Sequence, residues 1–196
     1  MNRTFLYESH RALGAKFVDF SGWEMPIHYG SQINEHNYVR NEVGIFDVSH
    51  MNIFDFNGTE ARKFMRYVLT NDVNKIEDGC ALYSVITNNE GGIIDDLIVY
   101  KFSNKKFRII SNCSTFNDVK EFFEDKIARY DCELIHRSNL GILAIQGPKS
   151  KSVIKMIFGS DLPECKSFSF EIKDKLFVSR TGYTCLLYTS DAADDL

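Results

Sequence analysis

The chain has 196 residues, of which 44% are hydrophobic and 26% are charged, a balance typical of a globular protein with room for one large domain or two small ones. Its net charge of -4 gives no broad basic field, which argues against nucleic acid or an anionic membrane surface as the main partner. The sequence shows neither a signal peptide nor an apolar run of membrane-spanning length, so we expect a cytoplasmic protein.

The five cysteines are odd in number, widely spaced and never arranged as Cys-x-x-Cys. This spacing argues against a disulfide framework and against a structural zinc site, and we expect reduced, mostly buried thiols. The five histidines show no His-x-x-x-His pair. We therefore predict no metal site.

The first predicted elements lie on either side of residue 50. A short helix is expected near residues 35–41. Residues 52–56 alternate between polar and apolar side chains, which predicts a half-buried strand that ends at Asn57-Gly58. Thr59 is a good N-cap for the helix that should follow. Its apolar stripe consists of Ala61, Phe64, Met65, Val68 and Leu69.

A hairpin and a second helix come next. Residues 81–86 and 93–100 are apolar, β-branched runs separated by a loop with two glycines, Gly91 and Gly92, which is typical of a β-hairpin. Residues 106–110 alternate as a further strand, and residues 132–135 form a later one. Between them, Ser114 or Thr115 can cap a helix with an apolar face. That face carries Phe116, Val119, Phe123 and Ile127.

The order of these elements is strand, helix, two or three strands, helix, strand. This order predicts an α+β fold with a ferredoxin-like, split βαβ unit, in which helices cover one side of an antiparallel sheet. The flanking segments add a strand at 141–145 and a helix at about 150–158. They indicate a second unit folded around the first.

The most informative segment contains two consecutive aspartates, Asp95 and Asp96. Strand alternation puts them on opposite faces, each with apolar neighbours on its own face. A carboxylate that loses solvation in this way is suited to share a proton with a bound amine. The alternative is a solvated hairpin mouth, where one aspartate caps a turn and the other bonds to backbone. The residues alone slightly favour this second interpretation.

Three other places carry polar groups with more than one interpretation. Asp47, Ser49 and His50 could form a nucleophilic cluster, although triad members are brought together by folds and not by adjacency, so a strand end with local backbone bonds fits equally. Asn112 can terminate a strand, or its amide can bond the edge of a heterocycle. Tyr183 follows a glycine turn that could expose its ring for stacking, while a structural tyrosine is the commoner case.

Taken in order, five motifs resemble the aminomethyltransferases, or T-proteins, of the glycine cleavage system, over residues 4–184. The motifs are Ser21-Gly22-Trp23-Glu24-Met25-Pro26, Val39-Arg40 with Val43-Gly44-Ile45-Phe46-Asp47-Val48-Ser49-His50-Met51, Gly91-Gly92-Ile93-Ile94-Asp95-Asp96-Leu97, Gln146-Gly147-Pro148, and Ser179-Arg180-Thr181-Gly182-Tyr183-Thr184.

The resemblance implies transfer of a methylene unit to tetrahydrofolate, the co-substrate, from an aminomethyl group on the lipoyl arm of a partner, the H-protein, with release of ammonia. It implies that Asp96 is the catalytic carboxylate. Four further residues match positions that line the folate pocket: Met51, Tyr83, Asn112 and Tyr183. Two other functions use related domains. These are a non-enzymatic folate-binding assembly factor and the folate domain of a sarcosine- or dimethylglycine-type oxidase.

The resemblance also implies a domain plan. Residues 1–51 with 137–184 are expected to form a discontinuous and incomplete folate-binding domain, mainly antiparallel β, into which the ferredoxin-like domain of residues 52–136 is inserted. The match of motifs stops after Thr184, and we expect residues 185–196 to be a foreign or artefactual tail. The C-terminal barrel domain of the family is then missing, which leaves the activity of this chain alone open.

Overall fold

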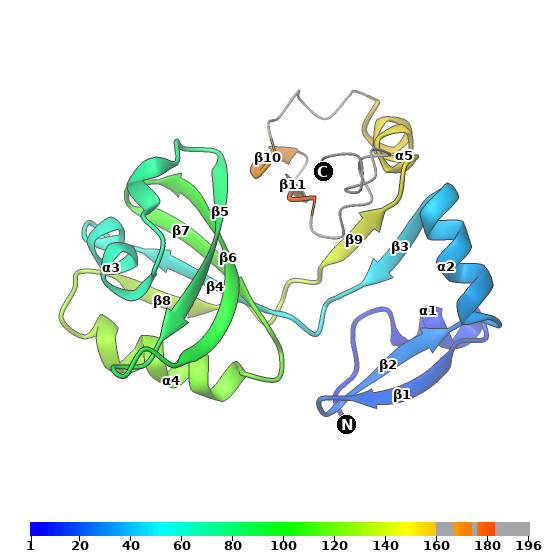
Figure 1. Ribbon diagram of the computed structural model, residues 1–196, viewed down its shortest axis with the longest axis horizontal. Helices are drawn as coiled ribbons and strands as arrows, with labels where there is room; N and C mark the ends of the chain where they lie inside the picture. Colours follow the sequence, from blue (N-terminus) through cyan, green and yellow to red (C-terminus); the bar gives the residue numbers. More distant parts are fainter. Residues whose placement is uncertain (160–166, 174–175, 183–196) are drawn as a thin grey trace, which may run out of the picture. The chain divides into compact units, whose positions relative to one another are not determined.

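The computed structural model describes residues 1–159, 167–173 and 176–182 (Figure 1). Contacts divide these residues into two compact units. Unit 1 contains residues 1–50, 141–159 and Gly182, and unit 2 contains residues 51–140, 167–173 and 176–181. The domain limits expected from the sequence stay predictions, and the expected tail at 185–196 lies outside the described residues.

Unit 2 is built around an antiparallel sheet with the strand order β11-β10-β5-β6-β7-β4-β8. Its elements are, in chain order, β4 (Asn52–Asn57), α3 (Ala61–Val68), the 3-10 helix η1 (Val73–Lys75), β5 (Cys80–Thr87), β6 (Ile93–Ser103), β7 (Lys106–Ser111), α4 (Phe116–Ile127), β8 (Glu133–His136), β10 (Ser169–Lys173) and β11 (Leu176–Arg180). The predicted α+β fold is confirmed, with three strands between the two helices.

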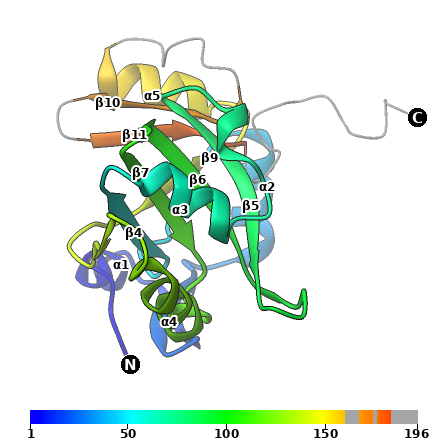
Figure 2. The same cartoon turned by 90° about the vertical axis from the view of Figure 1, so that its left-hand side faces the viewer.

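Both helices of unit 2 cover the same face of the sheet, as Figure 2 shows. The apolar stripe of α3 and one face of α4 meet the sheet in a single core. At its centre the fully buried Phe123 of α4 contacts the rings of Phe54, Phe56 and Phe64. Burial of these four aromatic side chains contributes about 2 kcal/mol each. The helical periodicity of the sequence therefore identified Phe64 and Phe123 as core residues.

The other face of the sheet carries a second, smaller aromatic cluster. Tyr100 and Phe102 of β6 contact Phe170 of β10 and Phe177 of β11, with ring centroids 4.7–5.7 Å apart. The β10–β11 hairpin thus covers part of the face opposite the helices. Asp96 belongs to this same face, because it alternates with Ile98 and Tyr100 along β6.

Two local expectations for β4 and α3 are wrong. Residues 52–56 are all buried, not half-buried, because β4 lies inside the sheet between β7 and β8 and its one charged side chain, Asp55, is paired with arginines. Thr59 does not cap α3. The N-cap position is Glu60, without a side-chain cap bond, and the Thr59 hydroxyl donates to Asp131 instead.

The turn between β4 and α3 explains why a glycine stands at position 58. A Cβ there would lie 2.1 Å from the carbonyl oxygen of Asp131 and 2.6 Å from the Cα of Cys132. Both atoms are backbone, so they cannot move aside. The glycine lets the segment before β8 run directly against this turn.

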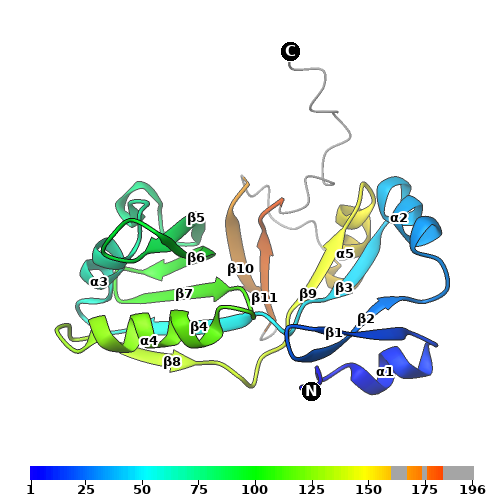
Figure 3. The same ribbon diagram turned by 60° about the horizontal axis from the view of Figure 1, so that its bottom comes forward.

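Unit 1 contains two short antiparallel sheets. Its elements are α1 (Tyr7–Ala12), β1 (Lys16–Phe20), β2 (Trp23–His28), α2 (Gln32–Asn41), β3 (Gly44–Asp47), β9 (Leu143–Gln146) and α5 (Ser150–Phe158). Figure 3 shows α1 beside the β1–β2 hairpin, where the Tyr7 and Phe17 rings are 4.8 Å apart. Strands β3 and β9 pair although almost one hundred residues separate them in the sequence.

The segment Gln146-Gly147-Pro148 forms a turn between β9 and α5. Gly147 has a φ of +115°, and a Cβ at this residue would lie 2.6 Å from the backbone oxygens of Val39 and Glu42. The turn therefore rests directly on the end of α2, and only glycine fits both the φ angle and the space.

Candidate functional site

The two consecutive aspartates of β6 lie in different environments. The side chain of Asp95 belongs to the buried face, and the residue is 4% exposed, while Asp96 is half-buried on the opposite face. Strand alternation predicted this separation. The two carboxylates therefore serve different purposes.

Asn112, directly after β7, holds both aspartates. Its backbone N–H donates to Asp95 Oδ2 at 3.1 Å, and its side-chain Nδ2 donates to Asp95 Oδ1 at 2.7 Å and to Asp96 Oδ1 at 3.1 Å. Both oxygens of Asp95 are thus occupied by one residue. The sequence left open that one of the two aspartates bonds to backbone. Asp95 does so, through the Asn112 N–H, whereas the Asp96 carboxylate receives its hydrogen bonds from the side chains of Tyr83 and Asn112.

Tyr83 of β5 binds the other oxygen of Asp96. Its hydroxyl donates to Asp96 Oδ2 at 2.5 Å. The register explains the contact: Tyr83 stands opposite Ile98 and Val85 opposite Asp96, so the four side chains share one face and Tyr83 reaches Asp96 diagonally. Tyr83 as a whole is 46% exposed.

This arrangement leaves Asp96 able to bind something more. A carboxylate has roughly four acceptor positions, and Asp96 receives one hydrogen bond on each oxygen from Tyr83 and Asn112. An orientation fixed by two donors, with acceptor capacity left over, suits a carboxylate that receives an N–H group or stabilises positive charge.

Two residues support Asn112 from behind. Asn52 of β4 donates through Nδ2 to the Asn112 carbonyl at 2.7 Å, and the Thr115 hydroxyl donates to the same oxygen at 3.2 Å. The sequence by itself does not single out Asn52. Its position beside Asn112 follows from the pairing of Asn52 with Ser111, which no local pattern reveals.

The remaining two predicted site residues are only partly placed. Met51 is half-buried and lies immediately before Asn52 at the start of β4. Tyr183 lies outside the described residues. The structure thus brings together Tyr83, Asp96 and Asn112, three of the five residues expected to act with the folate.

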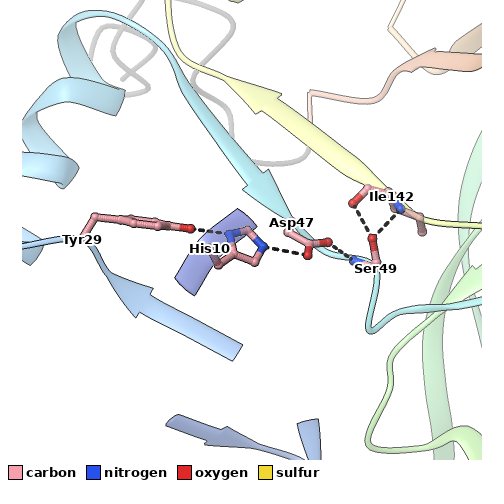
Figure 4. A network of polar contacts seen from close by, with 5 residues as sticks. All are labelled: His10, Tyr29, Asp47, Ser49 and Ile142. Atoms are coloured by element: carbon pink, nitrogen blue, oxygen red, sulfur yellow. Dashed lines mark hydrogen bonds and ion pairs between the residues drawn. The ribbon is translucent and has the colours of Figure 1, made fainter. Parts of the chain in front are cut away.

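The cluster of Asp47, Ser49 and His50 in unit 1 does not form a nucleophile. Asp47 Oδ1 accepts the Ser49 N–H at 3.0 Å, and the Ser49 hydroxyl donates to the carbonyl of Ile142 and accepts its N–H, as Figure 4 shows. This is the strand-end arrangement with backbone bonds. Asp47 Oδ2 instead faces His10 of α1, at 2.9 Å from Nε2, a contact the sequence did not predict.

A buried ion cluster in unit 2 was also missed. Asp55 receives two hydrogen bonds from Arg108 and one from Arg137. Burial pushes the pKa of the Asp55 carboxyl up, but the hydrogen bonds and charges of the two arginines outweigh burial and hold it below its ordinary value. The sequence places Asp55 at a polar position of an alternating strand, and this pattern gives no sign of its partners.

Metal ligands, membrane-spanning helices, cysteine thiols and surface cavities are further features that could indicate a function in the described part of the chain. In the described part of the chain, no three His, Cys, Asp or Glu side chains converge as metal ligands, and no helix is long and apolar enough to cross a bilayer. Cys80, Cys113 and Cys132 are half-buried, which is more exposed than expected. An open depression of about 490 Å³ lies beside α4, and neither Asp96 nor its two partners line it.

Comparison with known protein families shows which family the chain belongs to. The family model described as the GCVT N-terminal domain matches residues 6–187. The chain belongs to this family. The resemblance read from the five motifs is therefore confirmed.

Two comparisons extend this result. An aminomethyltransferase from Francisella tularensis subsp. tularensis is 46% identical to the chain over 188 residues, and one from Francisella philomiragia subsp. philomiragia is 45% identical. The crystal structure of glycine cleavage system aminomethyltransferase T from Bartonella henselae matches with a TM-score of 0.87 at 31% identity.

The matches to these relatives cover nearly all of this chain but only about half of each relative. The Francisella matches cover 94% of this chain and 52% of each relative, and the Bartonella match covers 93% and 51%. The chain thus spans about half the length of the curated relatives it matches. The Tyr83, Asp96 and Asn112 group lies within this shared half.

Proposed function

We propose that the protein is a tetrahydrofolate-dependent aminomethyltransferase of glycine cleavage that acts in the cytoplasm. In this proposal it transfers a methylene unit from the aminomethyl-lipoyl arm of the H-protein to tetrahydrofolate and releases ammonia. The observation that carries the proposal is the fixed carboxylate of Asp96, which is held by Tyr83 and Asn112 and retains acceptor capacity.

The residues present suit a reduced pterin. Its ring N–H groups need acceptors, which Asp96 offers, and its flat heterocycle needs a ring or an apolar surface, which the half-exposed Tyr83 and the neighbouring Ile98 offer. Tetrahydrofolate supplies the nitrogen atoms that take up the one-carbon unit. Tyr83 and Asn112, by contrast, act on Asp96 and fix its direction.

Asp96 has two roles in the proposed chemistry. As the carbon–nitrogen bond of the aminomethyl group breaks, positive charge develops on the carbon, and a fixed carboxylate nearby stabilises it. The attacking N–H must also lose its proton, and the same carboxylate can accept it or pass it toward the departing amine. Both roles require an oriented carboxylate, and the two hydrogen bonds fix its direction.

The substitution Asp96→Asn tests the proposal, because an amide keeps the size of the side chain and removes its charge. We expect turnover with aminomethyl-loaded H-protein to fall by about 10²–10⁴-fold, with little change in the Kd for tetrahydrofolate measured by titration. Asp118→Asn, at an exposed carboxylate of α4, is the matched control and should leave both quantities unchanged. Equal turnover of the Asp96→Asn and unsubstituted chains, or failure of the unsubstituted chain to bind tetrahydrofolate, would overturn the proposal.

A further inference from the structure

Asp95 of β6 binds Asn112 with both oxygens of its carboxylate. Asp95 Oδ2 accepts the Asn112 backbone N–H at 3.1 Å, and Asp95 Oδ1 accepts from Asn112 Nδ2 at 2.7 Å. Asp95 alternates along β6 with Leu97 and Val99 of the helix-covered core and is 4% exposed. Among the described residues, Asn112 is the one hydrogen-bond partner of the Asp95 carboxylate. Burial keeps water from competing for these two bonds.

The side-chain amide of Asn112 has one orientation that satisfies both aspartates. Its Nδ2 group carries two hydrogens. It lies 2.7 Å from Asp95 Oδ1, 3.1 Å from Asp96 Oδ1 and 3.2 Å from the carbonyl oxygen of Asp96. All three atoms are hydrogen-bond acceptors, so a flipped amide would put its own oxygen against three oxygens. The contacts therefore fix the NH₂ group of Asn112 toward the two aspartates.

The backbone of Asn112 is held independently of Asp95. Its carbonyl oxygen accepts from Asn52 Nδ2 at 2.7 Å and from the Thr115 hydroxyl at 3.2 Å. These two bonds fix where the residue lies. Within the described residues, the side-chain amide is bonded by Asp95 and Asp96, and its shortest bond is the one to Asp95. Asp95 thus supplies a contact that the backbone supports do not replace.

We propose that Asp95 is a positioning residue that acts through Asn112 on the carboxylate of Asp96, an inference that rests on the proposed function. From the core-facing side of β6, Asp95 holds the Asn112 amide so that one N–H stays on Asp96 Oδ1. Together with the Tyr83 hydroxyl on Oδ2, this bond sets the direction of the Asp96 carboxylate. Asp95 therefore contributes to turnover without contact with the reacting atoms.

The substitution Asp95→Asn tests this role, because it keeps the size of the side chain and replaces one acceptor oxygen with an NH₂ group. The backbone N–H of Asn112 cannot turn away, so the remaining oxygen at position 95 should stay on it. The new NH₂ group then faces Asn112 Nδ2, donor against donor. The Asn112 amide has to flip or rotate away. In either case its N–H bond to Asp96 Oδ1 is lost.

Asn52→Ala is the comparison variant, because it weakens the support of Asn112 without changing what the amide meets. It removes one donor to the Asn112 carbonyl and leaves the Thr115 hydroxyl in place. A purely structural role of Asp95 predicts similar effects for both variants, since each removes a buried bond to Asn112. A positioning role predicts that only Asp95→Asn frees the amide. Asp118→Asn, at an exposed carboxylate of α4, controls for the loss of one negative charge.

The first experiment uses NMR of the full chain with ¹⁵N-labelled asparagine to measure how fast the side-chain N–H groups of Asn112 exchange with water. Asn89, exposed in the loop between β5 and β6, is the internal reference. We expect Asn112 to exchange more slowly than Asn89 in the unsubstituted and Asn52→Ala chains, and as fast as Asn89 in the Asp95→Asn chain.

Several outcomes of this experiment overturn the proposal. Exchange of Asn112 as fast as that of Asn89 in the unsubstituted chain does so without any variant. Unchanged slow exchange in the Asp95→Asn chain, or equally fast exchange in the Asp95→Asn and Asn52→Ala chains, also does so. Loss of backbone amide protection in β6 and β7 of the Asp95→Asn chain would make Asp95 a residue required for folding, which equally contradicts a positioning role.

The second experiment measures turnover with aminomethyl-loaded H-protein and the Kd for tetrahydrofolate. Asp95→Asn should lower turnover about tenfold or more, the usual effect of losing a hydrogen bond to a charged group. The Kd should change less, because the ring of Tyr83 stays in place. Asn52→Ala should lower turnover less than Asp95→Asn, and Asp118→Asn should leave it unchanged.

The two proposals fail in different ways. Equal turnover of the Asp95→Asn and unsubstituted chains overturns the positioning role and leaves the proposed function standing. An unsubstituted chain that neither binds tetrahydrofolate nor turns over overturns the proposed function, while the exchange rates still show whether Asp95 fixes the amide of Asn112.

Discussion

Asp55 and Arg108 stand directly opposite each other on β4 and β7, and the guanidinium donates to both carboxylate oxygens, at 2.6 and 2.9 Å. Arg137 adds a third bond at 2.7 Å. The Asp55 side chain is 2% exposed. A buried carboxylate is tolerated here because both of its oxygens are paired with cations.

Asp55→Ala should therefore destabilise unit 2 strongly. The substitution leaves the buried Arg108 without its partner, which typically costs about 3–5 kcal/mol. Arg137→Gln removes only the more exposed cation, whose side chain is 31% exposed, and should cost about 1 kcal/mol or less. Urea unfolding, with amide hydrogen exchange of β4 and β7 to report on unit 2, measures both. Equal losses for the two variants would contradict this assignment of the energy.

Acid should weaken the same cluster. The pKa of Asp55 is held below its unfolded value near 3.8, so in the interval between the two values the unfolded chain binds more protons than the folded chain. The stability from Asp55 is then fully present above the unfolded pKa and is lost as pH falls through the folded pKa. Urea midpoints measured from about pH 5 to about pH 3 should fall less steeply for Asp55→Asn than for the unsubstituted chain. If the urea midpoints of the two chains fall equally steeply with pH, groups other than Asp55 cause the loss of stability in acid.

The elements of unit 2 were predictable because each carries a strong local signal. Helices α3 and α4 show apolar stripes at helical spacing, and the strands are short apolar runs bounded by glycine, asparagine or serine. The site was not predictable from such signals. Asn112 meets Asp95 and Asp96 only because Leu97 pairs with Ser111, and a slip of one residue would turn every side chain of β7 to the other face.

Local sequence patterns predict even less of unit 1. The sequence pattern does not predict strand β1 or the hairpin that it forms with β2. Ser21 and Gly22 adopt positive φ angles at the turn of this hairpin. The hydrogen-bonded chain of Tyr29, His10 and Asp47 joins residues up to 37 positions apart. Motif resemblance supplied Tyr83, Asp96 and Asn112 as a set, which pattern alone could not do, because each has an ordinary structural explanation by itself.

Tyr83→Phe should reduce turnover while largely preserving the folate surface, if the proposed function holds. The phenylalanine keeps the ring but removes the donor 2.5 Å from Asp96 Oδ2. Among the described residues, Asn112 is then the one remaining donor to the carboxylate. Loss of a hydrogen bond to a charged group corresponds to about a tenfold fall or more in turnover. Tyr67→Phe, at an exposed tyrosine of α3, serves as control. Unchanged turnover in Tyr83→Phe would show that the bond does not orient Asp96 during the reaction.

His50 should titrate below the ordinary histidine value of 6.5. Burial lowers its pKa, and the charge of Asp47 opposes this effect without cancelling it. Its ring lies edge-on to Phe20, with centroids 5.3 Å apart, and its buried Nδ1 has no hydrogen-bond partner among the described residues. A neutral His50 thus stabilises unit 1 above pH 6.5, and this contribution is lost as pH falls through the lowered pKa.

Two variants separate the two causes of the His50 shift. Phe20→Ala opens the ring to water and should raise the pKa of His50 toward 6.5, while Asp47→Asn removes the opposing negative charge and should lower it further. NMR titration of the His50 Cε1–H signal measures both pKa changes. A His50 pKa at or above 6.5 in the unsubstituted chain, or a rise in the Asp47→Asn chain, would show that burial does not dominate at this residue.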